Sequence, residues 1–263
     1  MTPAEIFDLS GHTALITGAA KGLGAKLAEA MGEAGASVVC ADIDENGAAQ
    51  TADTIRAMMG TGRRALHVRC DVSDEGDVRS LFDMVDSTFG RLDILFNNAG
   101  ISDTAMRQLH EYETAAWNHV LNVNLQSVFF CCRAALKIMV RQRRGKIIDI
   151  ASMWGLSGGA TLKPIPAYAA AKGAVVNLTR ELGLEYAPYN INVNAICPGF
   201  FVTRLGDGAY DSDTFREAAV AHTPMGRLAL ADEIKGTALY LASSASDFMC
   251  GHPLVIDGGV TAA

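Results

Sequence analysis

The sequence has few of the features that would place a protein in a membrane, outside the cell or on nucleic acid. No apolar run reaches the roughly 20 residues needed to span a bilayer, and the N-terminus MTPAEIFDLSG shows no secretory signal pattern. Positive charge is in deficit, because 22 Lys and Arg face 29 Asp and Glu, a net charge of −7. We therefore expect no nucleic-acid partner and no membrane partner.

Paired cysteines and histidines are also missing. The six cysteines contain no CxxC pair, and the six histidines contain no HExxH or similar pairing. Most of the cysteines fall in apolar stretches, where cysteine serves as a small hydrophobe in a reducing compartment. We expect no catalytic metal and a cytoplasmic protein.

No linker, internal repeat or low-complexity stretch interrupts the 263 residues. Apolar residues make up 49% of the chain and charged residues only 19%. That composition can fill one large core and speaks against disorder. We expect residues 1–263 to form a single domain.

Short, continuously apolar runs alternate with segments of helical length. The expected strands are 13–17, 37–41, 65–70, 92–96, 146–150, 192–196 and 254–256. The expected helices are 23–34, 45–59, 74–89, 114–141 and 166–187. Continuous apolar runs are typical of strands buried on both faces of a parallel sheet, and β-helix-β units connect through right-handed crossovers. The pattern predicts an α/β fold, a Rossmann-like doubly wound parallel sheet of about seven strands with helices on both faces.

The segment at about 200–231 breaks this alternation after the sixth expected strand. It carries Gly206, Gly208 and three aspartates (207, 211 and 213) before a short helical pattern. Ligands of open α/β sheets bind outside the carboxyl ends of the strands, where this segment begins. We expect it to cover the ligand crevice as a substrate lid.

A glycine-rich turn, TGAAKGLG at 17–24, follows the first expected strand. Glycines permit a tight turn and a close approach of the backbone to a phosphate at a helix N-terminus, although such a turn can also simply end a strand. The spacing is GxxxGxG without a GK[ST] ending, which speaks against a nucleoside-triphosphate loop. The turn therefore indicates a pyrophosphate site.

Asp42 ends the second expected strand, 18 residues after Gly24. A carboxylate at that place can accept hydrogen bonds from the ribose diol of NAD and repels the 2′-phosphate of NADP. Lys21, beside the turn, would instead attract that phosphate. Because Asp42 would lie directly at the ribose, we expect NAD, with NADP the less favoured cofactor.

Two further motifs follow the turn in order. Residues 97–100 read NNAG after the fourth expected strand, and residues 168–172 read YAAAK after the fifth. With the glycine turn, they make the chain resemble the short-chain dehydrogenase/reductase family from about Leu9 to Gly259. Each motif alone is weak, and their shared order makes the resemblance specific.

The resemblance implies a catalytic set and a cofactor site. The implied catalytic residues are Asn124, Ser152, Tyr168 and Lys172. The implied cofactor-binding residues are Gly18, Lys21, Gly22, Leu23, Gly24, Asp42, Ile43, Asp71, Val72, Asn98, Ala99, Gly100, Tyr168, Lys172, Pro198, Gly199, Phe201 and Thr203. In the family's arrangement, Asp71 and Val72 flank the adenine and Thr203 lies at the nicotinamide carboxamide.

The spacing of Tyr168 and Lys172 suits proton transfer. Residues four apart lie on one side of a helix. A phenol with a pKa near 10 is a poor base at neutral pH, and a nearby ammonium lowers that pKa. Ser152 can then hydrogen-bond the same substrate oxygen, while the family's arrangement implies Lys172 at the nicotinamide ribose and Asn124 at a water of the proton path.

The interval between Ser152 and Tyr168 is 16 residues, longer than is usual in the family. We expect this longer loop to reshape the substrate pocket and to leave the chemistry intact. The candidates for the pocket wall are Ser102, Met153, Trp154, Lys163, Phe200 and Arg204. A substrate carboxylate would require a cation, which Lys163, Arg204 or Arg107 could supply.

We therefore predict hydride transfer between NAD(H) and a secondary alcohol or ketone, on a sugar, polyol or sugar acid. A 3-oxoacyl-[acyl-carrier-protein] reductase that uses NADPH is the alternative enzyme, and a non-catalytic cofactor-binding scaffold is an alternative of another class. The presence of all four implied catalytic residues argues against the scaffold. Helices 114–141 and 166–187 pair across subunits in the family, which implies a homotetramer.

Overall fold

The computed structural model describes residues 2–59, 62–103, 107–160, 162–203 and 212–262. Across these residues, seven strands form one parallel sheet in the order β3-β2-β1-β4-β5-β6-β7. The strands are β1 (Thr13–Thr17), β2 (Ser37–Asp42), β3 (Ala65–Arg69), β4 (Ile94–Asn97), β5 (Gly145–Ile150), β6 (Ile191–Pro198) and β7 (Pro253–Ile256). The chain moves outward from β1 to β3, returns to β4 beside β1, and then moves outward the other way. The predicted doubly wound parallel sheet is confirmed.

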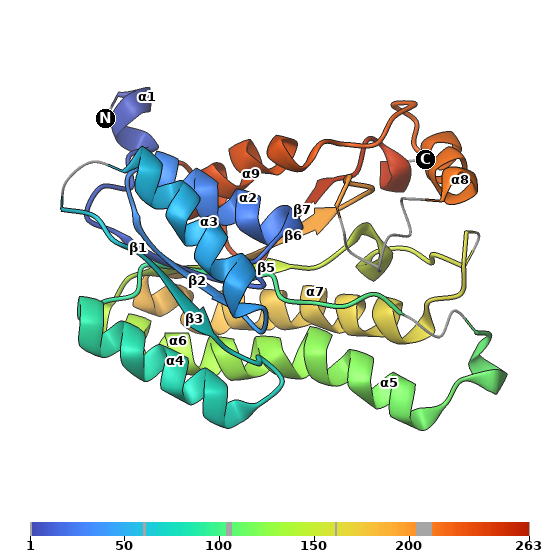
Figure 1. Cartoon of the computed structure of the whole chain (residues 1–263), viewed down its shortest axis with the longest axis horizontal. Helices are drawn as coiled ribbons and strands as arrows, with labels where there is room; N and C mark the ends of the chain where they lie inside the picture. The colour runs from blue at the N-terminus through green and yellow to red at the C-terminus, as the bar shows by residue number, and fades with distance from the viewer. Residues whose placement is uncertain (1, 60–61, 104–106, 161, 204–211, 263) are drawn as a thin grey trace.

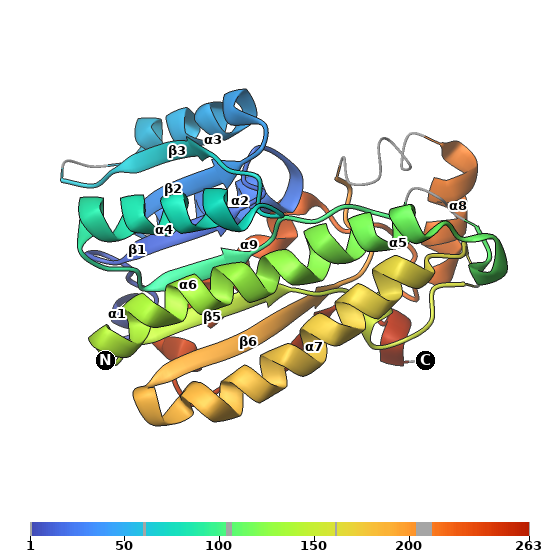
Figure 2. The same cartoon turned by 90° about the horizontal axis from the view of Figure 1, so that it is seen from below.

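Helices cover both faces of this sheet (Figures 1 and 2). One face carries α2 (Gly22–Glu33), α3 (Glu45–Met58) and α9 (Ile234–Ala242). The other face carries α4 (Glu75–Phe89), α5 (Thr114–Leu121), α6 (Ser127–Gln142) and α7 (Pro166–Tyr186). Two further helices, α1 (Pro3–Ile6) and α8 (Asp213–His222), lie outside these two layers. The sheet is therefore the middle of three layers.

Neighbouring strand residues point into different cores. Leu15 packs in the cluster under α4, α6 and α7, whereas Ile16 packs in the cluster under α2, α3 and α9. Ile147 and Ile148 divide in the same way. Each such side chain contributes about 1.5–3 kcal/mol to stability when it is fully buried. This two-sided burial is the reason that the strands read as continuous apolar runs rather than as alternating ones.

The helix expected over 114–141 is three segments of one continuous helical stretch. A π-helical turn, η2 (Asn122–Gln126), separates α5 from α6. By length and composition alone, the 29 residues Thr114–Gln142 could cross a membrane, so the expectation that no segment qualifies is wrong on that count. In the structure 56% of the apolar window of this stretch is buried, and α6 packs against α4 and the sheet.

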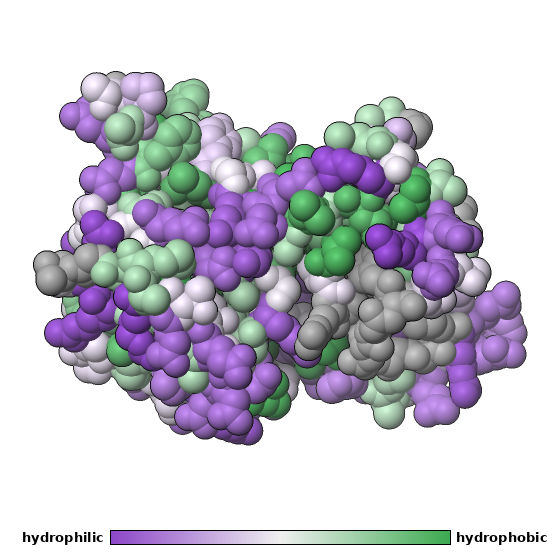
Figure 3. Space-filling view, turned by 45° about the horizontal axis from the view of Figure 1, so that its top comes forward, coloured by the Kyte–Doolittle hydropathy of each residue, from purple (hydrophilic) through white to green (hydrophobic). Residues whose placement is uncertain are grey.

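The surface differs between the two ends of the molecule. The face over α2 and α3 is mostly polar, and apolar side chains gather toward the end that carries α8 (Figure 3). Val202, Met225 and Leu230 are exposed apolar residues near that end. The carboxyl ends of the strands open toward the same end, so the apolar surface lies beside the expected ligand crevice.

Candidate active site

A cavity of about 630 Å³ runs along the carboxyl ends of the strands. Its size is typical of cofactor and substrate sites, and it lies at the point between β1 and β4 where the strand order reverses. Nineteen of the twenty residues in the predicted cofactor and catalytic sets line it. These lining residues are Gly18, Lys21, Gly22, Leu23, Gly24, Asp42, Ile43, Asp71, Val72, Asn98, Ala99, Gly100, Ser152, Tyr168, Lys172, Pro198, Gly199, Phe201 and Thr203.

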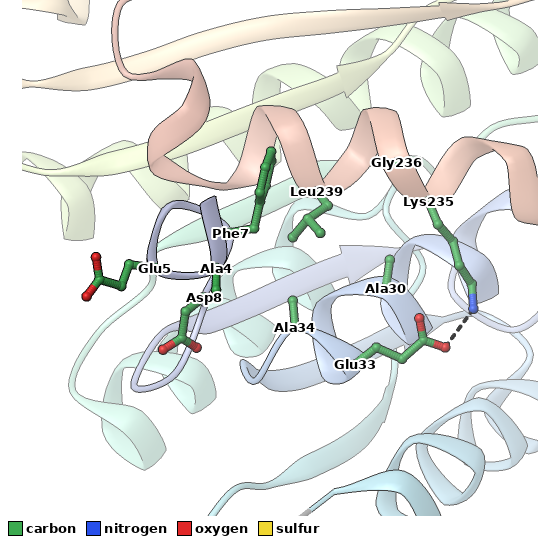
Figure 4. Close-up of a pocket in the computed structure, with 10 residues that line it drawn as sticks. All are labelled: Ala4, Glu5, Phe7, Asp8, Ala30, Glu33, Ala34, Lys235, Gly236 and Leu239. Atoms are coloured by element: carbon green, nitrogen blue, oxygen red, sulfur yellow. Dashed lines mark hydrogen bonds and ion pairs between the residues drawn. The ribbon is translucent and has the colours of Figure 1, made fainter. Parts of the chain in front are cut away.

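A second hollow lies between α1, α2 and α9 (Figure 4). Its charged side chains already have partners within the chain. Glu33 pairs with Lys235 at 2.8 Å, Glu5 accepts from the Thr2 amide at 2.7 Å, and Asp8 accepts from the Ser10 amide at 2.9 Å. The bonds of Glu5 and Asp8 stabilise the N-terminal segment, and the pair of Glu33 and Lys235 joins α2 to α9.

The glycine turn forms a backbone cradle at the start of α2. Gly18 and Gly22 have φ angles of 66° and 60°, in the left-handed region that favours glycine. A Cβ on Gly24 would lie 1.9 Å from the carbonyl oxygen of Gly18, so only glycine lets the turn close onto the helix. The side-chain amide of Asn98 donates to the carbonyls of Thr17 and Gly18, at 3.0 and 2.9 Å, and fixes the turn to β4.

The first turn of α2 has no side-chain cap. The first N–H groups of a helix have no intrahelical partner and attract anions, and here they lie beside the cavity. An uncapped helix start behind glycines that cannot carry a side chain fits the pyrophosphate of a dinucleotide.

The β2 end of the cavity fits an adenosine. The two carboxylate oxygens of Asp42 accept from the amides of Ala20 and Asp44, each at 2.9 Å. These bonds fix the carboxylate at the cavity wall, and each oxygen keeps a lone pair for a ribose hydroxyl. Asp71 is fixed in the same manner, because it accepts from the amide and the hydroxyl of Ser73 at 2.9 and 2.6 Å.

Tyr168, Lys172 and Ser152 meet where β5 faces α7. The Lys172 ammonium lies 5.7 Å from the centroid of the Tyr168 ring and donates to the carbonyl of Ile150 at 2.7 Å. The hydroxyl of Ser152 accepts from the amide of Trp154 at 3.1 Å, which fixes it at the end of β5. The three side chains thus share one wall of the cavity.

Burial controls the protonation of this group. It raises the pKa of Tyr168 above the ordinary phenol value, and a hydrogen bond with the Ser152 side chain opposes the rise. It lowers the pKa of Lys172 to about 8, with the carboxylate of Asp149 opposing. The sequence predicts that Lys172 lowers the pKa of Tyr168. In the structure the net shift is upward, because desolvation of the phenolate is the larger effect.

A buried polar network lies below this wall, and the sequence gives little sign of it. Asp149 of β5 is fully buried and accepts from the side chains of Asn97 and Thr179 at 2.8 and 2.9 Å. Among the described residues, Oδ1 of Asn97 has no hydrogen-bond partner. Burial raises the pKa of Asp149, and the charge of Lys172 opposes that rise. Through Asp149, this buried network interacts electrostatically with the charge of Lys172.

Among the predicted catalytic and cofactor-binding residues, all of which are described, Asn124 alone does not line the cavity. It is fully buried in the π-helical turn, where its side chain accepts from the Ile101 amide and donates to the Ile101 carbonyl, both at 2.8 Å. A Cβ on Gly100 would lie 3.0 Å from Oδ1 of Asn124 and 3.6 Å from Nζ of Lys172. Asn124 thus supports the strand-end segment that lies against Lys172.

The far end of the cavity has aromatic walls. Trp154 lies 6.0 Å from Phe200, and Phe200 lies 6.4 Å from Phe215 of α8, measured between ring centroids. Lys163 lines the cavity beside them, whereas Arg107 does not. Arg204 and the 204–211 part of the predicted lid lie outside the described residues.

Several lining residues are not predicted from the sequence. They are Asp44, Cys70, Ser73, Ile101, His119, Val123, Ile150, Ala151 and Ile165. Ile101 directly follows the NNAG motif, and Asp44 and Ser73 follow strand ends. Their positions next to predicted residues could therefore have indicated that they line the cavity. His119 reaches the cavity from α5 only through tertiary packing, which local patterns do not record.

The comparisons with known proteins agree with this geometry. A family profile described as enoyl-(acyl carrier protein) reductase matches residues 18–261. The chain is 41% identical over 251 residues to the cis-4-hydroxycyclohexanecarboxylate dehydrogenase of Sinomonas cyclohexanicum, which covers 95% of this chain and 97% of that protein.

Two solved structures are similar over nearly the whole chain. A short-chain type dehydrogenase/reductase from Mycobacterium marinum has a TM-score of 0.92 at 36% identity, with 98% of this chain and 99% of that chain covered. A gluconate 5-dehydrogenase from Burkholderia cenocepacia, in complex with NADP and tartrate, has a TM-score of 0.91 at 38% identity, with 100% of both chains covered.

Proposed function

Because the chain belongs to the short-chain dehydrogenase/reductase family, we propose that it interconverts a secondary alcohol and a ketone on a sugar acid or a related hydroxy acid, with NAD as its cofactor. It is an oxidoreductase with a nicotinamide cofactor. The observation that carries the proposal is the convergence of Ser152, Tyr168 and Lys172 on the wall of a cavity that also contains the glycine turn and Asp42.

The substrate class is supported by similar proteins and by the cavity. The Sinomonas relative is named for a hydroxy acid, and the Burkholderia structure is that of a gluconate dehydrogenase with tartrate bound. In this chain, the aromatic end of the cavity carries a cation, Lys163, which suits an acidic substrate.

The proposed chemistry divides into a hydride and a proton. A nicotinamide held in the cavity would supply the hydride chemistry, as acceptor in alcohol oxidation and as donor in ketone reduction. Tyr168 takes the hydroxyl proton as the alcohol is oxidised and gives it back in the reverse direction. Ser152 hydrogen-bonds the same substrate oxygen and holds it against the phenol.

Lys172 and Asn124 complete the proposed set. The bond from Lys172 to the Ile150 carbonyl fixes its ammonium beside the Tyr168 ring, where positive charge favours the phenolate as the proton arrives or leaves. Asn124 acts as a positioning residue, because it holds Ile101 and thereby the strand end at Gly100. The glycine turn would hold the pyrophosphate of the cofactor, and Asp71 and Val72 would hold its adenine.

The choice of NAD rests on the charge of the adenosine end. Asp42, Asp44 and Asp71 all line the cavity there, and a 2′-phosphate would meet their negative charge. Lys21 at the glycine turn is the cation that favours NADP, which the Burkholderia structure contains. The fixed position of Asp42 at the cavity wall makes NAD the proposed cofactor.

We further propose one domain over 1–263, with the segment at about 200–231 as a substrate lid. Phe200, Phe201, Thr203 and Phe215, which belong to this segment, line the cavity. A cytoplasmic location is supported by the six cysteines, which are all free and of which five are buried. Residues 204–211 lie outside the described residues, so the support for the lid comes from residues 200–203 and 212–231.

The proposal is tested by assays of the purified protein with NAD and NADP separately. The panel tests gluconate, 4-hydroxycyclohexanecarboxylate and a polyol with the oxidised cofactors and a 3-oxoacyl thioester with the reduced ones, and the absorbance of the reduced nicotinamide is followed. We expect oxidation of a hydroxy acid with NAD. Fastest turnover of the 3-oxoacyl thioester with NADPH would support the alternative 3-oxoacyl-[acyl-carrier-protein] reductase, and cofactor binding without turnover of any compound would support a scaffold.

A further inference from the structure

Lys163 lies at the cavity wall on a loop, and no described carboxylate forms an ion pair with it. The loop lies between β5 and α7, and the Lys163 side chain is half-buried. No hydrogen bond or ion pair involves its ammonium among the residues that the structure describes. Burial lowers the pKa of this amine, and only the carboxylate of Asp103 opposes the shift. A partly desolvated ammonium in this state is stabilised by an anionic ligand.

The carboxylate of Asp103 already has other partners. It is fully buried, and it accepts from the Tyr112 hydroxyl and, at 3.2 Å, from the Ala167 amide at the start of α7. These bonds tie the first turn of α7 to the segment after β4. Asp103 therefore serves to fix the N-terminus of the helix that carries Tyr168, and no carboxylate of the described residues forms an ion pair with the ammonium of Lys163.

An aromatic wall connects Lys163 with the reacting end of the cavity. Nζ of Lys163 lies 5.1 Å from the centroid of the Phe215 ring. From Phe215 the ring contacts continue through Phe200 to Trp154, whose amide donates to the hydroxyl of Ser152. These apolar rings replace water on one side of the cavity, and Coulomb attraction is stronger where less water surrounds the charges. A ligand carboxylate at Lys163 is thus attracted more strongly than it would be at a solvated surface lysine.

Of the two other cations that the sequence offers for a carboxylate, Arg107 is described and does not compete with Lys163. Arg107 is 57% exposed, approaches Glu113 at 3.9 Å and does not line the cavity. Arg204 lies outside the described residues. Of the lysines that line the cavity, Lys21 lies at the glycine turn and Lys172 donates to the Ile150 carbonyl.

We propose that Lys163 binds the carboxylate of the substrate, so that the enzyme selects hydroxy acids and keto acids over neutral alcohols and ketones. This inference rests on the proposed function and assigns the acid-binding residue within the same site. Lys163 determines specificity and takes no part in proton transfer, which remains with Tyr168. The substrate then lies along the aromatic wall, with its carboxylate at Lys163 and its carbinol at Ser152.

The test compares the best hydroxy acid of the panel with its uncharged primary amide, in the wild type and in Lys163→Met. For the acid, we expect Lys163→Met to reduce kcat/KM by about 10- to 100-fold, mainly through KM, because one charge-assisted hydrogen bond is lost. For the amide, we expect a change of no more than about twofold. Lys163→Arg should restore part of the preference for the acid, since a cation remains.

Lys137→Met is the matched control, because Lys137 is exposed on α6 and does not line the cavity. It should leave both substrates unchanged. An equal loss for the acid and the amide in Lys163→Met, or no loss for either, would overturn the role of Lys163 while the proposed function stands. If the wild type oxidises none of the hydroxy acids, the proposed function itself fails, and the Lys163 inference fails with it.

Discussion

The protonation of Tyr168 is set by two opposed effects at the scale of single residues. Its burial raises the phenol pKa, and the Ser152 hydrogen bond lowers it. The ammonium 5.7 Å from its ring centroid keeps its charge only below the Lys172 pKa of about 8. The rate of proton transfer by Tyr168 should therefore depend on pH, through the ionisation of its own phenol and through the charge of Lys172.

The pH dependence of the two directions should differ. Alcohol oxidation requires the Tyr168 phenolate, whose population grows with pH because the raised pKa lies above neutrality. We expect kcat/KM for oxidation to rise between about pH 6 and about pH 8, and less steeply above that, where Lys172 loses its charge. Ketone reduction, which requires the phenol, should not rise over the same range. An oxidation rate that is flat or falling from pH 6 to pH 8 would contradict the role of Tyr168.

Asp42 is expected to set the cofactor preference by its charge. Asp42→Ala removes the carboxylate that repels a 2′-phosphate, and Lys21 remains to attract that phosphate. The ratio of kcat/KM for NAD to that for NADP should fall by about 10- to 100-fold, as expected for one close charge interaction. Asp53→Ala on the exposed side of α3 is the matched control and should leave the ratio unchanged. An unaltered ratio in Asp42→Ala would refute the argument for NAD.

Element-scale features differ in how far the sequence predicts them. The five inner strands follow from continuous apolar runs, because both faces of the sheet are buried there, whereas the edge strands β3 and β7 are only partly buried. Helix α9 (Ile234–Ala242) is not predicted, because its nine residues carry a short, weakly patterned stretch after the irregular lid. The sequence likewise does not predict the π-helical turn at Asn122–Gln126, since its residues continue the helical pattern on both sides.

The candidate site, too, contains residues that the sequence predicts and residues that only the packing of the fold reveals. Motifs predict the glycine turn, Ser152, Tyr168 and Lys172, since each follows a strand end or shares a helix face. The sequence does not single out Asp149 as a partner of the Lys172 charge, because that relation depends on how β5 and α7 pack. Nor can it choose Lys163 among three cations, because the choice depends on which loop the fold turns toward the cavity.

The junction of β1 and α2 should not tolerate a side chain at Gly24. In Gly24→Ala, the new Cβ would lie 1.9 Å from a backbone carbonyl that cannot move without opening the turn. We expect a loss of about 1–3 kcal/mol in the free energy of unfolding, measured by urea denaturation, and weaker cofactor binding. Gly236→Ala in α9 is the matched control, because no atom lies within 4 Å of the new Cβ, and it should stabilise the protein by up to about 1 kcal/mol. Equal stability of the two variants would contradict the close packing of the turn.

At the scale of the whole molecule, the helices that cover one face also present apolar side chains outward. Phe129 of α6 is 45% exposed and Leu184 of α7 is 78% exposed. Solvent-exposed apolar residues on adjacent long helices are typical of surfaces that pair between subunits. We propose that α6 and α7 pair across subunits in a homotetramer.

The assembly can be tested by light scattering coupled to size exclusion. We expect a mass near four times the 27.8 kDa of one chain. Leu184→Glu should lower that mass, because a charge would be buried without a partner at the interface. Leu109→Glu, at an exposed leucine outside these helices, should leave the mass unchanged. A wild-type mass of a single chain would contradict the tetramer.

The central claim is that Tyr168 transfers the proton in an oxidoreductase reaction, and Tyr168→Phe tests it most directly. The substitution removes one hydroxyl and keeps the ring that packs in α7, so the dissociation constant for NADH should change by no more than about twofold. We expect kcat to fall by at least about 100-fold, within the range for loss of a general acid or base. Tyr186→Phe, on the same helix and away from the cavity, should keep wild-type activity. A Tyr168→Phe variant that binds NADH and retains a kcat near that of the wild type would contradict the account.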